Sequence, residues 1–103
     1  MSRPLIDYLV LDAVADDFES LELVVESVNS NRLTTAAAAP IDFSVGEVAV
    51  SVGRCIREGL VQAYSPGRGT FEPLGDRVVP HDLESCWFGL TPQGRATHES
   101  WRV

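Results

Sequence analysis

The first apolar stripe with helical spacing lies near the start of the chain. It predicts a helix that begins at Ser2 and has Pro4 as an early residue, because proline fits the first turn of a helix. Tyr8 and Leu11 fall outside this stripe and are therefore candidates for the surface. The core-facing positions, which recur every three or four residues, are Leu5, Ile6, Leu9, Val10, Ala13 and Val14.

A second stripe follows directly. Asp16 and Glu19 have the spacing of a capping box, with aspartate as a variant in its first position, so they predict a helix that starts at Asp16. The run Asn29–Asn31 ends this helix, and residues 32–42 form a connector whose alanine run is stopped by Pro40. The apolar positions of the helix are Phe18, Leu21, Val24, Val25 and Val28.

The third stripe carries the clearest boundary signals in the chain. Ser44 and Glu47 have the spacing of a capping box at its start. Phe43 and Val48 occupy the two positions of a hydrophobic staple. Gly59 comes just after the last helical residue, where glycine commonly ends a helix. The expected core positions are Val45, Val48, Ala49, Val52 and Ile56, with Cys55 at their edge.

The pattern then changes to the period of a strand. Residues 60–64 alternate apolar and polar positions, which is typical of a half-buried strand. Residues 65–85 form a long excursion that opens with turn residues, and we expect a short strand at Arg77–Val79 within it. Residues 86–90 are predicted to return and pair with residues 60–64.

A short helix is predicted at the end, with Thr91 as its cap and Pro92 as its first residue. With this helix, "IREGLVQAY" at residues 56–64 and "WFGLTPQGRA" at residues 87–96 resemble a pattern found in bacterial winged helix-turn-helix regulators, with the MarR-like and PadR-like families closest in style. The resemblance implies one α+β winged-helix domain over residues 1–103. The long connector, the very long wing and the short final helix depart from those families.

The resemblance also implies how such a protein meets DNA, with the third helix in the major groove and the wing against the backbone. Opposite the expected core of the third helix lie Ser51, Arg54 and Arg57, and the wing adds Arg68 and Arg77. Arginine binds guanine and phosphate, so these residues are the candidate DNA contacts. The alternative for Arg54 and Arg57 is an ordinary solvated helix face.

The charge of the chain weighs against DNA. Its 103 residues have a net charge of −7, and residues 1–30 hold one arginine against seven acidic residues. We therefore predict a regulatory module that binds protein, either a second copy of itself or another chain, and keep a DNA-binding transcriptional regulator as the alternative. The acids of the predicted second helix, which would repel the phosphates that a DNA-binding protein neutralises, are Asp16, Asp17, Glu19 and Glu22.

A homodimer interface is predicted from Tyr8, Leu11 and Trp101. Tyr8 and Leu11 are flanked by Asp7 and Asp12, and apolar side chains rimmed by charge are typical of an interaction patch. Trp101 is a large ring close to the last residue. The alternative is that the wing or the connector covers the first two residues and that Trp101 folds back onto the domain.

Signals for chemistry are weak. His81 and His98 have no metal-ligand spacing relative to each other or to the two cysteines, Cys55 and Cys86. The run "SPGRGT" lacks the Gly-Lys-Ser/Thr ending of a phosphate loop. We therefore predict a protein that is not an enzyme and that has no catalytic residues, no metal and no cofactor.

Composition and run lengths bear on location. Hydrophobic residues make up 45% of the chain, which is enough for a core, and the charged fraction of 22% argues against disorder. No apolar run is long enough to cross a bilayer, and the first apolar stretch contains Asp7 and Asp12, which a signal peptide would not. All basic residues are arginine, as a GC-rich bacterial genome would produce. We expect a cytoplasmic bacterial protein.

Overall fold

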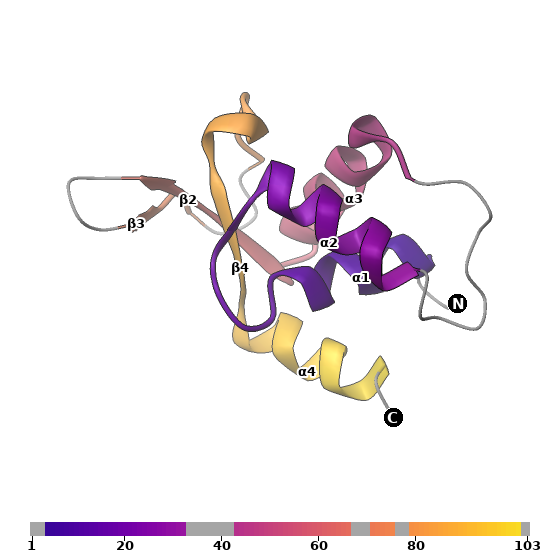
Figure 1. Ribbon diagram of the computed structural model, residues 1–103. Helices are drawn as coiled ribbons and strands as arrows, with labels where there is room; N and C mark the ends of the chain where they lie inside the picture. The colour runs from indigo at the N-terminus through magenta and orange to yellow at the C-terminus, as the bar shows by residue number, and fades with distance from the viewer. Residues whose placement is uncertain (1–3, 33–42, 67–70, 76–78, 102–103) are drawn as a thin grey trace.

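The computed structural model describes residues 4–32, 43–66, 71–75 and 79–101. They form four helices, a short 3-10 helix and a four-stranded sheet (Figure 1). In chain order the elements are α1 (Leu5–Ala13), β1 (Glu19–Ser20), α2 (Leu21–Arg32), α3 (Val45–Arg57), β2 (Val61–Pro66), β3 (Phe71–Pro73), the 3-10 helix η1 (Leu83–Ser85), β4 (Trp87–Leu90) and α4 (Pro92–Trp101). The predicted α+β class is confirmed.

The sheet is antiparallel throughout, with the strand order β1-β4-β2-β3. Val61 lies opposite Leu90, and Tyr64 lies opposite Trp87. The predicted pairing of residues 60–64 with residues 86–90 is therefore confirmed. β3 was not predicted and pairs with the far end of β2, while the strand expected at Arg77–Val79 falls largely outside the described residues.

The start of the second helix was predicted wrongly. Residues 19 and 20 are extended and pair with β4, and α2 begins only at Leu21. The Ser20 hydroxyl oxygen accepts a hydrogen bond from the Leu23 amide at 3.4 Å, so Ser20 takes the place that Asp16 was expected to have. The reason is tertiary. β4 has β2 on one side only, and its other edge offers backbone groups that β1 can satisfy.

α1 begins at Leu5 with Pro4 as its N-cap, and the predicted start at Ser2 lies outside the described residues. The helix packs against α2, α3 and α4, so its burial extends well beyond the predicted stripe (Figure 1). Leu11, expected at the surface, is fully buried, and so is Asp7. A single apolar stripe predicts that one face of a helix is covered, whereas the three helices around α1 cover more than one of its faces.

The capping box at the start of α3 is confirmed. The Glu47 amide donates to the Ser44 hydroxyl oxygen at 3.1 Å, and the Ser44 amide donates to Glu47 Oε1 at 3.0 Å. Gly59 follows the helix with φ of 78°, a left-handed conformation that favours glycine. The buried face is turned relative to the prediction, because Val45 is 51% exposed whereas Ser51 is buried.

The junction between α4 and the rest of the domain explains part of the sequence pattern. The Thr91 hydroxyl oxygen accepts a hydrogen bond from the Gly94 amide at 2.9 Å, which confirms the predicted cap. The same hydroxyl donates to the Gly59 carbonyl at 2.6 Å. A Cβ on Gly94 would lie 1.9 Å from the Leu60 carbonyl oxygen, so only glycine fits there. Thr91 and Gly94 therefore hold α4 against the turn between α3 and β2.

Candidate interaction surfaces

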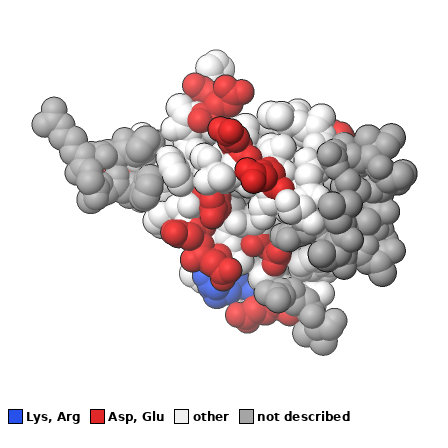
Figure 2. All heavy atoms as spheres, in the orientation of Figure 1, with Lys and Arg blue, Asp and Glu red and all other residues white. Residues whose placement is uncertain are grey.

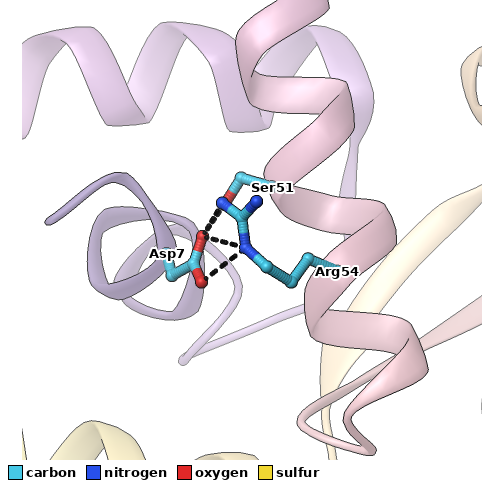
Figure 3. A network of polar contacts seen from close by, with 3 residues as sticks. All are labelled: Asp7, Ser51 and Arg54. Atoms are coloured by element: carbon cyan, nitrogen blue, oxygen red, sulfur yellow. Dashed lines mark hydrogen bonds and ion pairs between the residues drawn. The ribbon is translucent and has the colours of Figure 1, made fainter. Parts of the chain in front are cut away.

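Asp7 is the centre of a buried polar network that joins α1 to α3 (Figure 3). The Ser51 hydroxyl donates to Asp7 Oδ1 at 2.6 Å. Arg54 donates from Nη2 to Oδ1 at 2.6 Å and from Nε to Oδ2 at 3.0 Å. The guanidinium thus binds the carboxylate in a bidentate manner, and the Ser51 hydroxyl adds a further hydrogen bond. These bonds hold the Ser51 and Arg54 side chains against Asp7.

The network gives Arg54 a structural role, because it joins α3 to α1. Its hydrogen bond to Asp7 raises the pKa of the Arg54 guanidinium, and this effect outweighs the opposing effect of burial. Asp7 is buried, and a buried carboxylate is tolerated only when it is paired and hydrogen-bonded. The Arg54 side chain is 36% exposed, yet its charged end is directed at Asp7.

This placement changes how the candidate DNA contacts must be interpreted. Ser51 was expected on the exposed face of α3. That expectation is wrong, because its side chain is buried where α3 meets α1. Arg54 lies in the ion pair with Asp7. Arg57 is exposed at the end of α3. Arg68 and Arg77 lie outside the described residues.

Asp7 itself was missed as a structural residue, although a signal for it exists in the sequence. It lies at the edge of the apolar stripe of the first predicted helix, where a carboxylate that becomes buried requires a cation. Arg54, on the neighbouring helix, is one of few basic residues available to supply that cation. Only packing shows that the two residues meet.

The face of the molecule that Figure 2 shows is acidic. Acidic side chains gather over η1, along α2 and over the loop before it, and a basic group lies near α4 (Figure 2). The exposed acidic residues of these three segments are Asp16, Asp17, Glu22, Glu26, Asp82 and Glu84. We call this set the acidic surface. Such a surface repels phosphates and attracts cationic partners.

A hollow opens beside the acidic surface, between the beginnings of α2 and α3 and the 3-10 helix η1. Its volume is about 470 Å³. The described residues that line it are three apolar residues, a serine and two glutamates: Leu21, Val25, Val45, Ser20, Glu22 and Glu84. Among the described residues that line it, none is basic. The combination is an apolar floor with an acidic rim.

The predicted homodimer residues form contacts within the chain. The rings of Tyr8 and Trp101 are stacked, with centroids 5.2 Å apart and planes at 10°. Trp101 therefore folds back onto the domain, which was the alternative. His98 Nε2 lies 2.8 Å from Asp12 Oδ1 and ties α4 to α1 in the same region. Leu11 is buried, so its prediction as an interface residue is wrong.

The described part of the chain holds no group of three or more His, Cys, Asp or Glu residues placed to bind a metal ion. Cys55 and Cys86 are buried thiols. None of the helices within the described ranges combines the length and the apolar character needed to cross a membrane.

Comparison of the chain with protein family models, with curated proteins and with solved structures gave no significant match. Similarity therefore does not distinguish between DNA and protein as the partner. The burial of Ser51, the ion pair of Arg54 and the acidic surface are the observations that bear on that choice.

Proposed function

We propose that this chain is a non-enzymatic winged-helix module that acts through protein–protein interaction, with a cationic partner bound at the acidic surface. The observation that carries this proposal is the network around Asp7. It directs Ser51 and Arg54 of α3, which a DNA-reading helix would present to the groove, toward α1. The helix that resembles a recognition helix thus uses these side chains for packing.

Two features support the winged-helix assignment. The element order places β1 between the first two helices, and β1 joins the hairpin formed by β2 and β4. In addition, Thr91 and Gly94, which belong to the motif that resembles winged-helix regulators, meet Gly59 and Leu60 at one junction. The motif therefore has a physical role in this chain that does not depend on any ligand.

The balance of charge supports protein over DNA. DNA-binding proteins neutralise several phosphates, and affinity depends on the number of cations they bring to the backbone. Arg57 is exposed on α3, but Glu47 on the same helix and Glu58 directly after it are exposed as well. The nearby α2 adds Glu22 and Glu26. A cationic protein would instead be attracted by these groups, which raises the rate of association at low salt.

Two measurements test the proposal. The first is selection of binding sequences from a pool of random duplex DNA by the immobilised protein. We expect no enriched sequence, because α3 holds two arginines and one of them, Arg54, is paired with Asp7. Enrichment of a sequence whose binding is lost in Arg57→Ala would overturn the proposal and establish the DNA-binding alternative.

The second measurement is capture of bacterial proteins on the wild-type chain and on two charge variants. We expect Glu22→Gln with Glu26→Gln to lose partners that the wild type retains at low salt. Glu72→Gln with Glu99→Gln removes the same charge from other exposed positions and should retain them. Equal capture by both variants would show that the acidic surface is not the binding surface.

A further inference from the structure

Val45 is an apolar residue that is exposed at the start of α3. It is the first residue of α3 and was expected in the core, yet it is 51% exposed. Isolated exposed valines are ordinary. Val45, however, lines the same hollow as Val25 and the buried Leu21, which come from α2. Three apolar side chains from two helices therefore form one concave floor.

Among the described residues that line this hollow, the two charged ones are both acidic. Glu22 on α2 and Glu84 on η1 are both exposed, and both line it. Figure 2 shows acidic side chains over these same two elements on one face of the molecule. An apolar side chain that enters the hollow would place its flanking residues beside carboxylates, and the favourable flanking residues are lysine and arginine.

The elements around the hollow are held in place by local hydrogen bonds. The capping box of Ser44 and Glu47 fixes the start of α3 and therefore the position of Val45. Asp82 Oδ1 accepts a hydrogen bond from the Glu84 amide at 3.1 Å, which fixes the start of η1. Ser20, which also lines the hollow, belongs to β1 and pairs with Trp87. A preformed site loses less entropy when a ligand binds.

We infer that the hollow between α2, α3 and η1 is the docking site for a cationic amphipathic peptide segment of the protein partner. In this arrangement, one or two large apolar side chains of the segment pack on Leu21, Val25 and Val45, and its basic residues pair with Glu22 and Glu84. The inference rests on the proposed function and specifies its site. The volume of about 470 Å³ is within the usual range for ligand pockets.

A second copy of this chain is not the expected occupant of the hollow. The chain has a net charge of −7, so two copies brought together at the acidic surface would repel each other. Nucleic acid is disfavoured by the same carboxylates. A peptide segment rich in lysine or arginine complements the rim, and its apolar side chains complement the floor.

The test uses a phage-displayed library of random peptides as the probe, selected on the full chain at low salt. We expect the enriched peptides to combine lysine or arginine with large apolar residues. One enriched peptide, labelled with fluorescein, then gives dissociation constants by anisotropy. Peptides without basic residues, or the absence of any enrichment, would overturn the inference.

The apolar floor is tested with two valines of the same helix. Val45→Ser should weaken binding of the labelled peptide about tenfold, a typical effect for an interface anchor. Val50→Ser changes a residue that is 63% exposed on α3 but does not line the hollow, and its dissociation constant should match the wild type. Equal dissociation constants for the two variants would overturn the inference.

The rim is tested by charge removal and salt. Glu22→Gln with Glu84→Gln should weaken the peptide about tenfold at low salt and much less at high salt, because added salt screens exposed charges. Glu72→Gln with Glu99→Gln is the control of equal net charge. If the two pairs weaken binding equally, the acidic rim has no specific role and the inference fails.

Backbone amide spectra recorded by NMR show that each variant is folded and locate the peptide. We expect the largest shifts at Leu21, Val25 and Val45. A peptide that binds but shifts other residues would overturn the docking site and leave the proposed function intact, because the partner would then bind elsewhere on the protein. Selection of a DNA sequence, as described above, would instead defeat the proposed function itself.

Discussion

Asp7 and Glu84 are both carboxylates near α3, but the two regions around them differ. On the side of α3 that faces α1, Asp7 is buried and bonded to Ser51 and Arg54. At the start of the same helix, Glu84 is exposed and lines the hollow together with Val45. We call these regions the packed side and the open side.

The difference between the two sides separates charges that build the fold from charges that are available to a partner. A buried pair strongly affects stability, because removing one partner leaves an uncompensated charge. Exposed carboxylates contribute little to stability but shape the potential that an approaching molecule meets. Counting arginines and acids along the chain does not make this distinction, whereas burial does.

The largest effect is expected from Arg54→Met, which removes the ion pair between Arg54 and the buried Asp7. We expect the free energy of unfolding to fall by about 2 to 4 kcal/mol, measured by urea denaturation, since Asp7 is buried but the Arg54 side chain is partly exposed. Arg57→Met is the matched control on the same helix and should change it by less than about 0.5 kcal/mol. Addition of Asp7→Asn to Arg54→Met should recover part of the loss. Equal effects of the two arginine variants would mean that the packed side does not depend on this pair.

The next effect concerns the junction with α4. Gly94→Ala would place a methyl group against the Leu60 carbonyl, and we expect a loss of about 1 to 3 kcal/mol. Gly46→Ala is the control, because a Cβ added at Gly46 would lie 3.8 Å from the Ser44 hydroxyl oxygen, which is an ordinary contact distance. Its thermal midpoint should equal or exceed that of the wild type. A midpoint for Gly94→Ala that matches this control would contradict the close approach.

A smaller effect is expected at the boundary between the two sides, where Ser44 caps α3 and positions Val45. Ser44→Ala should lower the free energy of unfolding by about 1 kcal/mol, since the Glu47 amide loses its acceptor. Ser30→Ala changes an exposed serine within α2 and should stay within about 0.5 kcal/mol of the wild type. A denaturant midpoint for Ser44→Ala that is unchanged would show that the cap is not formed in solution.

The smallest effect on stability should come from the open side. Glu22→Gln with Glu84→Gln should change the free energy of unfolding by less than about 0.5 kcal/mol, because both side chains are exposed. The same two substitutions are expected to weaken binding of the peptide. A clear loss of stability would indicate that these carboxylates belong to the packed side, and the comparison would no longer hold.

Sequence alone determined the elements whose signals lie within a few residues of one another. Ser44 and Glu47 are three residues apart, and their reciprocal hydrogen bonds formed as expected. Thr91, with Pro92 after it, marked the start of α4, and Gly59 marked the end of α3. The alternation over residues 60–64 predicted β2 and its pairing with β4. Such signals are reliable because the interacting groups are already close along the chain.

Tertiary structure alone decided which residues outside the predicted apolar stripes are buried and which charges remain exposed. Asp7 meets Ser51 across a separation of 44 residues and Arg54 across 47, and no local pattern reports such a contact. The same packing buries Leu11, leaves Val45 exposed and makes residues 19 and 20 a strand at the edge of β4. Periodicity states that a helix has an apolar face, but the neighbouring elements determine how much of the helix is covered. The hollow arises in this way, from the ends of α2, α3 and η1 meeting at one place.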